Sequence, residues 1–240
     1  MAKIQYSFKL SSNLTEQVHD YHYITLPFKY NYAVGFAAYL KERPKVILDQ
    51  IALRTLHLDD PRSSHFDVNV RKYLEAVKAL YPDIAFIPAF HSRKHGYGKN
   101  LEITKEIHSW FEDKYDINSL AGLILGDEPD EWIEWIKLCW GRDSWGVLTQ
   151  NNLKAVEMLI REAGELNHVH LFESNWLLHQ EKLKRFAPLT INTITFDGDV
   201  YSFLKATKQT LHFEKPNLVV RQGSLDLYEF IETIEKFLQA

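Results

Sequence analysis

Short apolar segments alternate with longer amphipathic segments along most of the chain, and this alternation predicts strands that are each followed by a helix. The pattern is most regular from Val70 onward, where Val70, Leu74 and Val77 share one helical face. A short apolar run bounded by turn residues is typical of a strand buried on both faces, as in a parallel sheet. We therefore predict strands at 4–10, 45–56, 84–90, 120–125, 145–149, 168–172, 189–196 and 218–221.

Eight strand and helix units in 240 residues predict a (β/α)8 TIM barrel that forms a single domain over residues 1–240. An open, doubly wound parallel sheet is the alternative. The barrel is favoured because the units continue evenly to a strongly amphipathic segment at 227–238. Segment 19–32 is rich in Tyr, Phe and His without a clear period, and no element is assigned to it. It is a loop or a short extra element that covers the bottom of the barrel or forms a dimer contact.

The composition and net charge of the chain limit the kinds of partner that it is expected to bind. The net charge of −4 argues against nucleic acid as the main partner, because duplex binding usually needs a basic surface. Cys139 is the single cysteine, which excludes an intramolecular disulfide and fits a reducing compartment. No run approaches the roughly 18 apolar residues of a membrane span. We expect a soluble, cytoplasmic protein without a membrane partner.

The carboxyl ends of barrel strands face one mouth, where we expect a small-molecule ligand. Polar residues that follow the predicted strands are therefore candidate site residues, although such residues also cap helices and solvate loops. They are Lys9, Ser11, Arg54, His57, His91, Asp127, Glu128, Thr149, Gln150, Glu173, Asp197, Arg221 and Gln222. Lys9, Gln150, Asp197 and Arg221 are the expected substrate-binding residues.

The segment SLAGLILGDEPDE at 119–131 is the most conspicuous of these strand ends. Its apolar run stops at Gly126, and four acids follow within five residues. Asp127 and Glu128 are candidates for acid–base catalysis, since glycine lets the backbone approach a ligand closely. Asp130 and Glu131 are expected to stabilise the start of the next helix, where acids are favoured.

The histidines give one further candidate. His91 follows a strand and can serve as a base or a ligand clamp, because imidazole titrates near neutral pH. His168 and His170 form an HxH pair whose rings are expected on one face of a strand. The predicted strand 168–172 puts this pair at the strand's start, away from the mouth, and we predict no metal site there. Arg221 precedes a helix start, but the acidic loop at 197–199 argues against a phosphate site.

Five segments resemble, in the same order along the chain, the methylenetetrahydrofolate reductase family of flavin-binding (β/α)8 barrels. They are IQYSFKLSSNLTEQ, PKVILDQIAL, IPAFHS, LAGLILGDEP and HLFESNWLLHQEKLKRF. The fourth is similar to the family's Leu-Arg-Gly-Asp-Pro-Pro signature. In this chain Leu125 stands at the signature arginine, Lys9 nearest the family's first-strand glutamate, and Glu173 nearest its sixth-strand glutamine.

The resemblance implies a folate-linked oxidoreductase that binds a flavin such as FAD. It places Asp127 beside the flavin ring, Gly126 and His91 near the cofactor, and Glu173 where it helps to orient the ring systems. One-carbon metabolism would then be its pathway class.

Two other functions remain open from the residues themselves. One is a sugar hydrolase that uses Glu128 as the acid and Glu173 or Asp197 as the second carboxylate, since glycosidases place two carboxylates across the cleaved bond. The other is a barrel that has lost catalysis and binds a partner. Oligomer formation is compatible with each of them.

Overall fold

A computed structural model describes residues 2–9, 23–28, 45–50, 64–91, 95–172 and 184–197 of the chain. The strands are β1 (Lys3–Tyr6), β2 (Phe8–Lys9), β3 (Tyr23–Pro27), β4 (Lys45–Asp49), β5 (Ile84–Ala85), β6 (Gly122–Leu125), β7 (Ser144–Leu148), β8 (Leu166–Leu171) and β9 (Ile191–Phe196). The helices are α3 (Ser64–Leu80), α4 (Tyr97–Phe111), α5 (Pro129–Leu138) and α6 (Asn152–Ala163), with a 3₁₀ turn at Ile117–Ser119.

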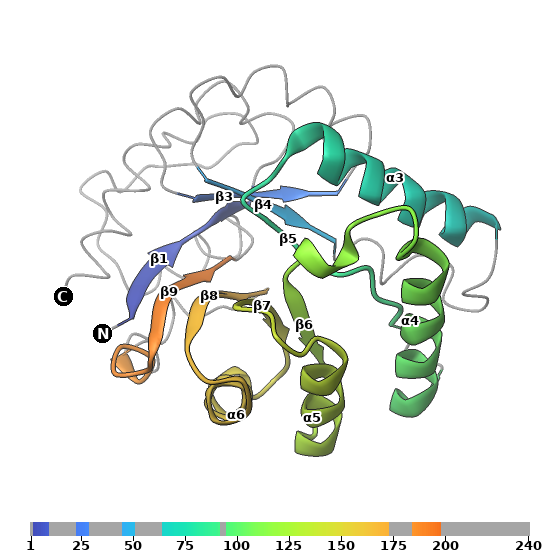
Figure 1. Ribbon diagram of the computed structural model, residues 1–240. Coiled ribbons are helices and arrows are strands. Elements are labelled where there is room, and N and C mark those ends of the chain that lie inside the picture. Colours follow the sequence, from blue (N-terminus) through green and yellow to red (C-terminus); the bar gives the residue numbers. More distant parts are fainter. Residues whose placement is uncertain are drawn as a thin grey trace, which may run out of the picture.

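The protein is a mixed α/β structure in which all paired strands run parallel, as predicted. One sheet has the order β1-β9-β8-β7-β6, and the other has the order β2-β3-β4-β5. Two junctions link the sheets: only Ser7 separates β1 from β2, and an isolated parallel bridge joins Phe86 to Ala121 between β5 and β6. In Figure 1, α3, α4, α5 and α6 follow one another around the outer side of the strands.

Side-chain alternation divides the strands into an outer and an inner face. On β8, Val169 and Leu171 are completely buried, as expected for strands covered by helices. The alternate positions, His168 and His170, are also buried but polar, and both rings meet the side chain of Thr195 on β9. This face therefore carries a buried polar cluster on β8 and β9.

Three sequence-based predictions need correction. Segment 19–32, left unassigned, contains β3, which pairs with β2 and β4. The strand predicted at 45–56 ends at Asp49. The strand predicted at 189–196 as seventh in order is the ninth strand of the structure, β9, and it pairs with β1 over Lys3–Tyr6. The strand predicted at 218–221 and the amphipathic segment at 227–238 lie outside the described residues.

The remaining elements agree with the patterns to within a few residues. The helix predicted from Val70 is α3, and the strand predicted at 84–90 is short, with its regular part at β5 and its continuation buried but irregular. Among the described residues no helix is both long and apolar enough to cross a membrane.

Candidate functional site

The interior face of β8 and β9 carries four polar side chains in contact with one another. His170, Thr195 and Asp197 have no exposed surface, and His168 is 4% exposed. The Thr195 hydroxyl lies 2.7 Å from His168 Nε2 and 2.8 Å from His170 Nδ1. His170 Nε2 lies 3.4 Å from Asp197 Oδ2. The register explains the cluster, because His168 and His170 on β8 pair with Thr193 and Thr195 on β9.

Aromatic rings enclose His170 on its other sides. The ring of Phe172 meets it edge-on at 4.6 Å between centroids, and Phe86 lies at 6.0 Å. A glycine makes room for these rings, since a Cβ on Gly146 would lie 2.6 Å from Phe172 and 2.7 Å from Phe86. The imidazole is thus held in a fixed orientation and separated from water.

The enclosure does not give every polar atom of the cluster a hydrogen bond. Within the described part of the chain, His170 Nε2 makes no hydrogen bond, and Asp197 Oδ2 faces it at a distance longer than a good N–H···O bond. A buried polar group without a partner costs free energy, so each one in a folded protein calls for an explanation, and a catalytic role is one of them. Burial also lowers the pKa of His168 to about 3, with smaller contributions from the neighbouring His170 and Lys45, so that ring is neutral near pH 7.

A second group of buried polar side chains lies on β1 to β4. The Ser7 and Thr25 hydroxyls are 2.5 Å apart with no exposed surface. Asp49 is 2% exposed and ends β4, and Gln50 follows it. Gln50 donates a hydrogen bond from Nε2 to the Ile87 carbonyl, which fixes its amide, while its Oε1 makes no hydrogen bond to any described residue. Asp49 and Asp197 are the two buried carboxylates among the described residues.

The conspicuous acidic loop after β6 is organised differently. Gly126 has φ +99°, and a Cβ there would lie 2.0 Å from Glu131 Oε2. That oxygen accepts hydrogen bonds from the backbone N–H groups of Asp127 and Glu128, at 2.8 and 3.3 Å. The prediction that Glu131 stabilises the helix start is therefore confirmed, and the glycine is required by the close approach of this carboxylate.

The predicted catalytic residues of this loop lie at the exposed rim. Asp127 Oδ1 accepts a hydrogen bond from the backbone N–H of Gln150 at 3.0 Å, which ties the end of β6 to the end of β7. Asp127, Glu128 and Gln150 are all exposed. The structure thus brings Asp127 and Gln150 together, as the strand-end argument predicted.

The other predicted site residues are spread more widely. Lys9 ends β2 and pairs with Thr25. His91 follows the buried segment after β5 and is half-buried. Asp197 belongs to the enclosed cluster. Glu173, Arg221, Ser11, Arg54, His57 and Gln222 lie outside the described residues.

The prediction for the HxH pair was right that both rings lie on one face of the strand, and wrong about where along the strand they lie. Both rings reach Thr195, so they share a face. However, β8 begins at Leu166, two residues before the predicted start, and His170 is therefore next to the last residue of the strand. Sequence reasoning also missed Asp49, because an overlong strand 45–56 hid the polar residue at its true end.

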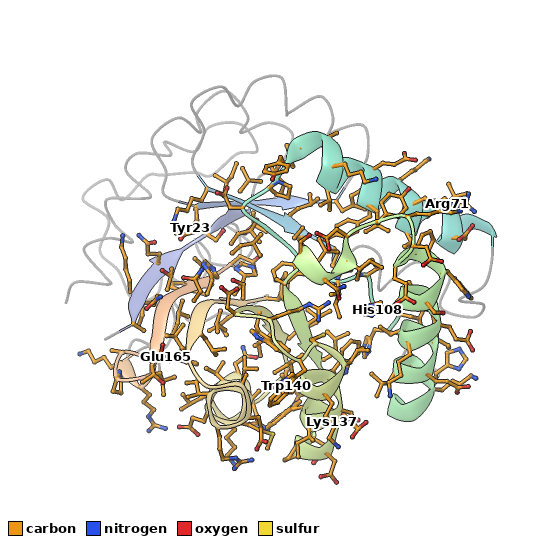
Figure 2. All side chains as sticks on the ribbon, in the orientation of Figure 1. Tyr23, Arg71, His108, Lys137, Trp140 and Glu165 are labelled. Carbon is orange, nitrogen blue, oxygen red and sulfur yellow. The ribbon has the colours of Figure 1, made fainter. Side chains whose placement is uncertain are left out.

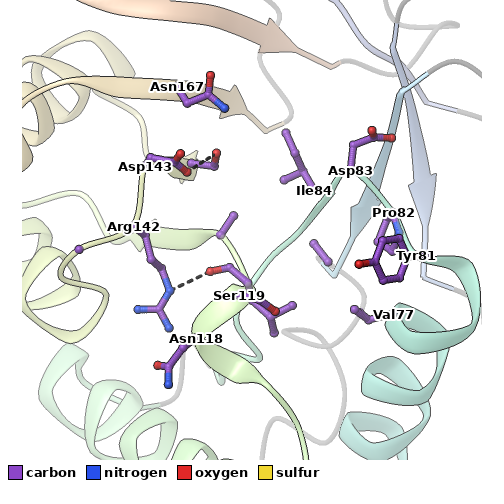
Figure 3. A pocket seen from close by; sticks show the side chains of 15 residues that line it. Val77, Tyr81, Pro82, Asp83, Ile84, Asn118, Ser119, Arg142, Asp143 and Asn167 are labelled. Atoms are coloured by element: carbon purple, nitrogen blue, oxygen red, sulfur yellow. Dashed lines mark hydrogen bonds between the residues drawn. The ribbon is translucent and has the colours of Figure 1, made fainter.

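A pocket of about 590 Å³ lies at the opposite, amino-terminal end of β5 to β8 (Figure 3). Its charged and polar lining includes Asp83, Arg142, Asp143 and Asn167. The Arg142 guanidinium donates to the carbonyl of Leu120 at 2.8 Å, which holds it at the wall. We call this space the amino-end pocket.

Two of the residues that the resemblance aligns with the family's signature have other roles in the structure. Leu125, at the position of the signature arginine, is 2% exposed and belongs to the hydrophobic core. One oxygen of the Asp127 carboxylate is bound to the Gln150 backbone. No group of three or more potential metal ligands occurs within the described ranges.

Comparison with known proteins adds no family assignment. No protein-family model matches the sequence, and no curated protein is similar to it. The resemblance to the reductase family stays a prediction, and a functional assignment depends on the site itself.

Proposed function

We propose that the chain is a (β/α)8-barrel hydrolase whose general acid–base group is Asp197, oriented by His170. The observation that carries this proposal is the 3.4 Å contact between His170 Nε2 and Asp197 Oδ2, made by two side chains without exposed surface. A buried polar pair is weak support for stability, because the desolvation cost offsets the attraction. Enclosed acid–base pairs are typical of catalytic sites.

The strand pairings support the barrel. With β1 and β2 taken as one interrupted strand, every strand has a parallel neighbour on both sides: β9 pairs with β1, β2 with β3, and the Phe86–Ala121 bridge connects β5 to β6. Closure would place the carboxyl ends of all eight strands around one mouth, where barrel enzymes hold their substrates. Asp197 follows β9 directly and so belongs to that end.

The second carboxylate of the proposed hydrolase is Asp49. Alternation puts Asp49 on the same face as Ile47, whose register partner Thr25 bonds to Ser7 in the interior. Asp49 also lies at a carboxyl end, and it is buried, whereas Glu128 is exposed. Cleavage of a glycosidic bond needs two such groups, one of which protonates the leaving oxygen. A hydroxyl-rich substrate would also supply a donor for Gln50 Oε1.

The test is turnover of a panel of nitrophenyl glycosides by the wild type and three matched variants. Asp197→Asn and Asp49→Asn should each lower kcat/KM at least about 100-fold, as expected for loss of an acid–base group. Glu128→Gln should stay within about threefold of the wild type. Full activity in Asp197→Asn, or loss confined to Glu128→Gln, would contradict the role of Asp197 and favour the exposed acidic loop after β6 as the catalytic region. Absence of turnover on every glycoside would refute the hydrolase assignment.

The reductase-type function predicts a different result on the same protein. If it holds, the purified protein is yellow or takes up added flavin tightly, and Asp127→Ala abolishes that uptake. The hydrolase proposal predicts an absorbance spectrum that does not change when flavin is added.

A further inference from the structure

The four polar groups on β8 and β9 form a continuous line along the strands. Starting from the carboxyl end, the line runs from Asp197 to His170, then to the Thr195 hydroxyl and on to His168. His168 is two residues closer to the start of β8 than His170. The line therefore crosses the interior from the proposed catalytic carboxylate toward the amino-terminal end.

The amino-end pocket brings solvent close to the far end of this line. Asn167, the residue before His168, lines the pocket, and so does Ser144, the register partner of His168. His168 retains 4% exposure, whereas His170 and Asp197 retain none. Tyr23, labelled in Figure 2, packs its ring edge-on against His168 at 5.3 Å between centroids, and Lys45 lies within reach of the Tyr23 hydroxyl at 3.4 Å.

The single hydroxyl proton of Thr195 couples the two imidazoles. The hydroxyl can donate to one of the two facing ring nitrogens, and the other nitrogen must then donate to the hydroxyl oxygen. With Asp197 ionised, His170 Nε2 carries the proton that faces the carboxylate, so His170 Nδ1 accepts from Thr195. His168 Nε2 must then carry a proton and donate it to Thr195. Both rings are consequently expected in the Nε2–H form.

We propose that His168, Thr195 and His170 relay protons between the amino-end pocket and Asp197. This inference rests on the proposed role of Asp197 as the acid–base group. In a barrel whose catalytic carboxylate is sealed from water, the relay would return Asp197 to its starting protonation state from the side opposite the substrate.

One transfer through the relay balances in protons at every group. His170 Nε2 passes its proton to Asp197, and His170 Nδ1 takes the hydroxyl proton of Thr195. The Thr195 oxygen takes the proton of His168 Nε2, and His168 Nδ1 takes one from a solvent water, which leaves as hydroxide. The result is a neutral Asp197 whose acid proton faces His170 Nε2, two neutral Nδ1–H rings, and a Thr195 hydroxyl that accepts from His170 Nδ1 and donates to His168 Nε2.

This route avoids a charged imidazole at the buried His168. His168 is neutral near pH 7, since burial depresses its pKa and the nearby Lys45 and His170 disfavour a second positive charge. The relay needs only an exchange between neutral tautomers, which a buried pair of imidazoles permits. A transfer that left a positive charge on His168 would incur the desolvation cost that lowers the pKa of this ring.

The experiment measures hydrogen–deuterium exchange of the His170 ring N–H by NMR on full-length protein labelled with ¹⁵N-histidine. Thr195→Val removes the hydroxyl with little change of shape, and Thr195→Ser keeps it. Exchange of the His170 proton should slow at least tenfold in Thr195→Val and stay within about twofold of the wild type in Thr195→Ser. The Trp145 indole N–H, which donates to the Arg142 carbonyl from a fully buried ring, is the internal reference for local opening.

Either of two results would overturn the relay. One is equal exchange in Thr195→Val and the wild type with the Trp145 reference unchanged, which would show that the protons travel elsewhere. The other is a wild-type spectrum at neutral pH in which His170 is in the Nδ1–H form while His168 is in the Nε2–H form. Neither measurement needs a substrate, so the relay can fail while Asp197 remains essential for turnover, and the reverse outcome is equally distinguishable.

Discussion

Two carboxyl ends of strands in this molecule carry acids in opposite surroundings. After β6, four acids fall within five residues, and Asp127, Glu128 and Asp130 remain exposed. After β9, Asp197 stands against His170 with no exposed surface. In the first region the polar groups satisfy the turn and the start of α5, whereas in the second a ring nitrogen is left without a hydrogen bond. The many acids after β6 therefore belong to the start of a helix. The single enclosed acid after β9, Asp197, belongs to the candidate site.

The largest effect that would separate the two regions is on stability. His170→Leu leaves the Asp197 carboxylate buried without its imidazole, and removal of one partner from a buried pair typically costs about 3–5 kcal/mol. Glu128→Leu, at the exposed N-cap position of α5, should cost only about 1 kcal/mol, as is typical for loss of a helix cap. Chemical denaturation of both variants measures the difference. Equal destabilisation by the two substitutions would mean that the buried His170–Asp197 pair contributes no more to stability than the exposed acidic loop.

The pH dependence of stability gives the next effect. Burial lowers the pKa of His168 to about 3, and it lowers that of His108, which bonds to the Pro88 carbonyl, to about 4. The unfolded chain titrates these rings near 6.5, so it binds more protons than the folded protein below that pH. Stability should therefore be highest above pH 6.5 and fall as the pH drops toward 4 and 3, by roughly 3 kcal/mol for His108 and roughly 5 kcal/mol for His168.

His168→Gln should flatten this dependence between pH 6.5 and 4, and His108→Gln provides a matched control outside the polar cluster. Denaturation midpoints at several pH values measure the slopes. A His168→Gln slope equal to that of the wild type would show that the ring is hydrated in the folded protein, and it would weaken the contrast between interior and rim.

The sequence predicted the elements better than it predicted their ends, and the site depends on the ends. The apolar runs identify β6, β7 and β9 because parallel strands are buried on both faces. The start of β8 was missed because Leu166 and Asn167 follow a helix end without an apolar run, and that two-residue error moved His170 to the wrong end of the strand. Asp49 was hidden in the same way by apolar residues beyond β4. Thr195 could not be recognised at all, because its importance arises from contacts with two residues 25 and 27 positions away.

The smallest expected effect concerns Asp127, the residue that the sequence made most prominent. Its Oδ1 accepts one backbone hydrogen bond from Gln150 at an exposed site. Asp127→Asn keeps an amide oxygen at that position, so the bond can survive with only its charge removed, and the loss should stay below about 1 kcal/mol. Asp127→Ala removes the acceptor and should cost slightly more.

Turnover by both variants should remain within about threefold of the wild type, because neither touches the interior carboxylates. A large loss of turnover in Asp127→Asn with unchanged stability would reverse the comparison, since only a group that contacts the substrate or a cofactor has that signature. The acid-rich rim would then be the catalytic region, and the enclosed pair on β8 and β9 would be structural.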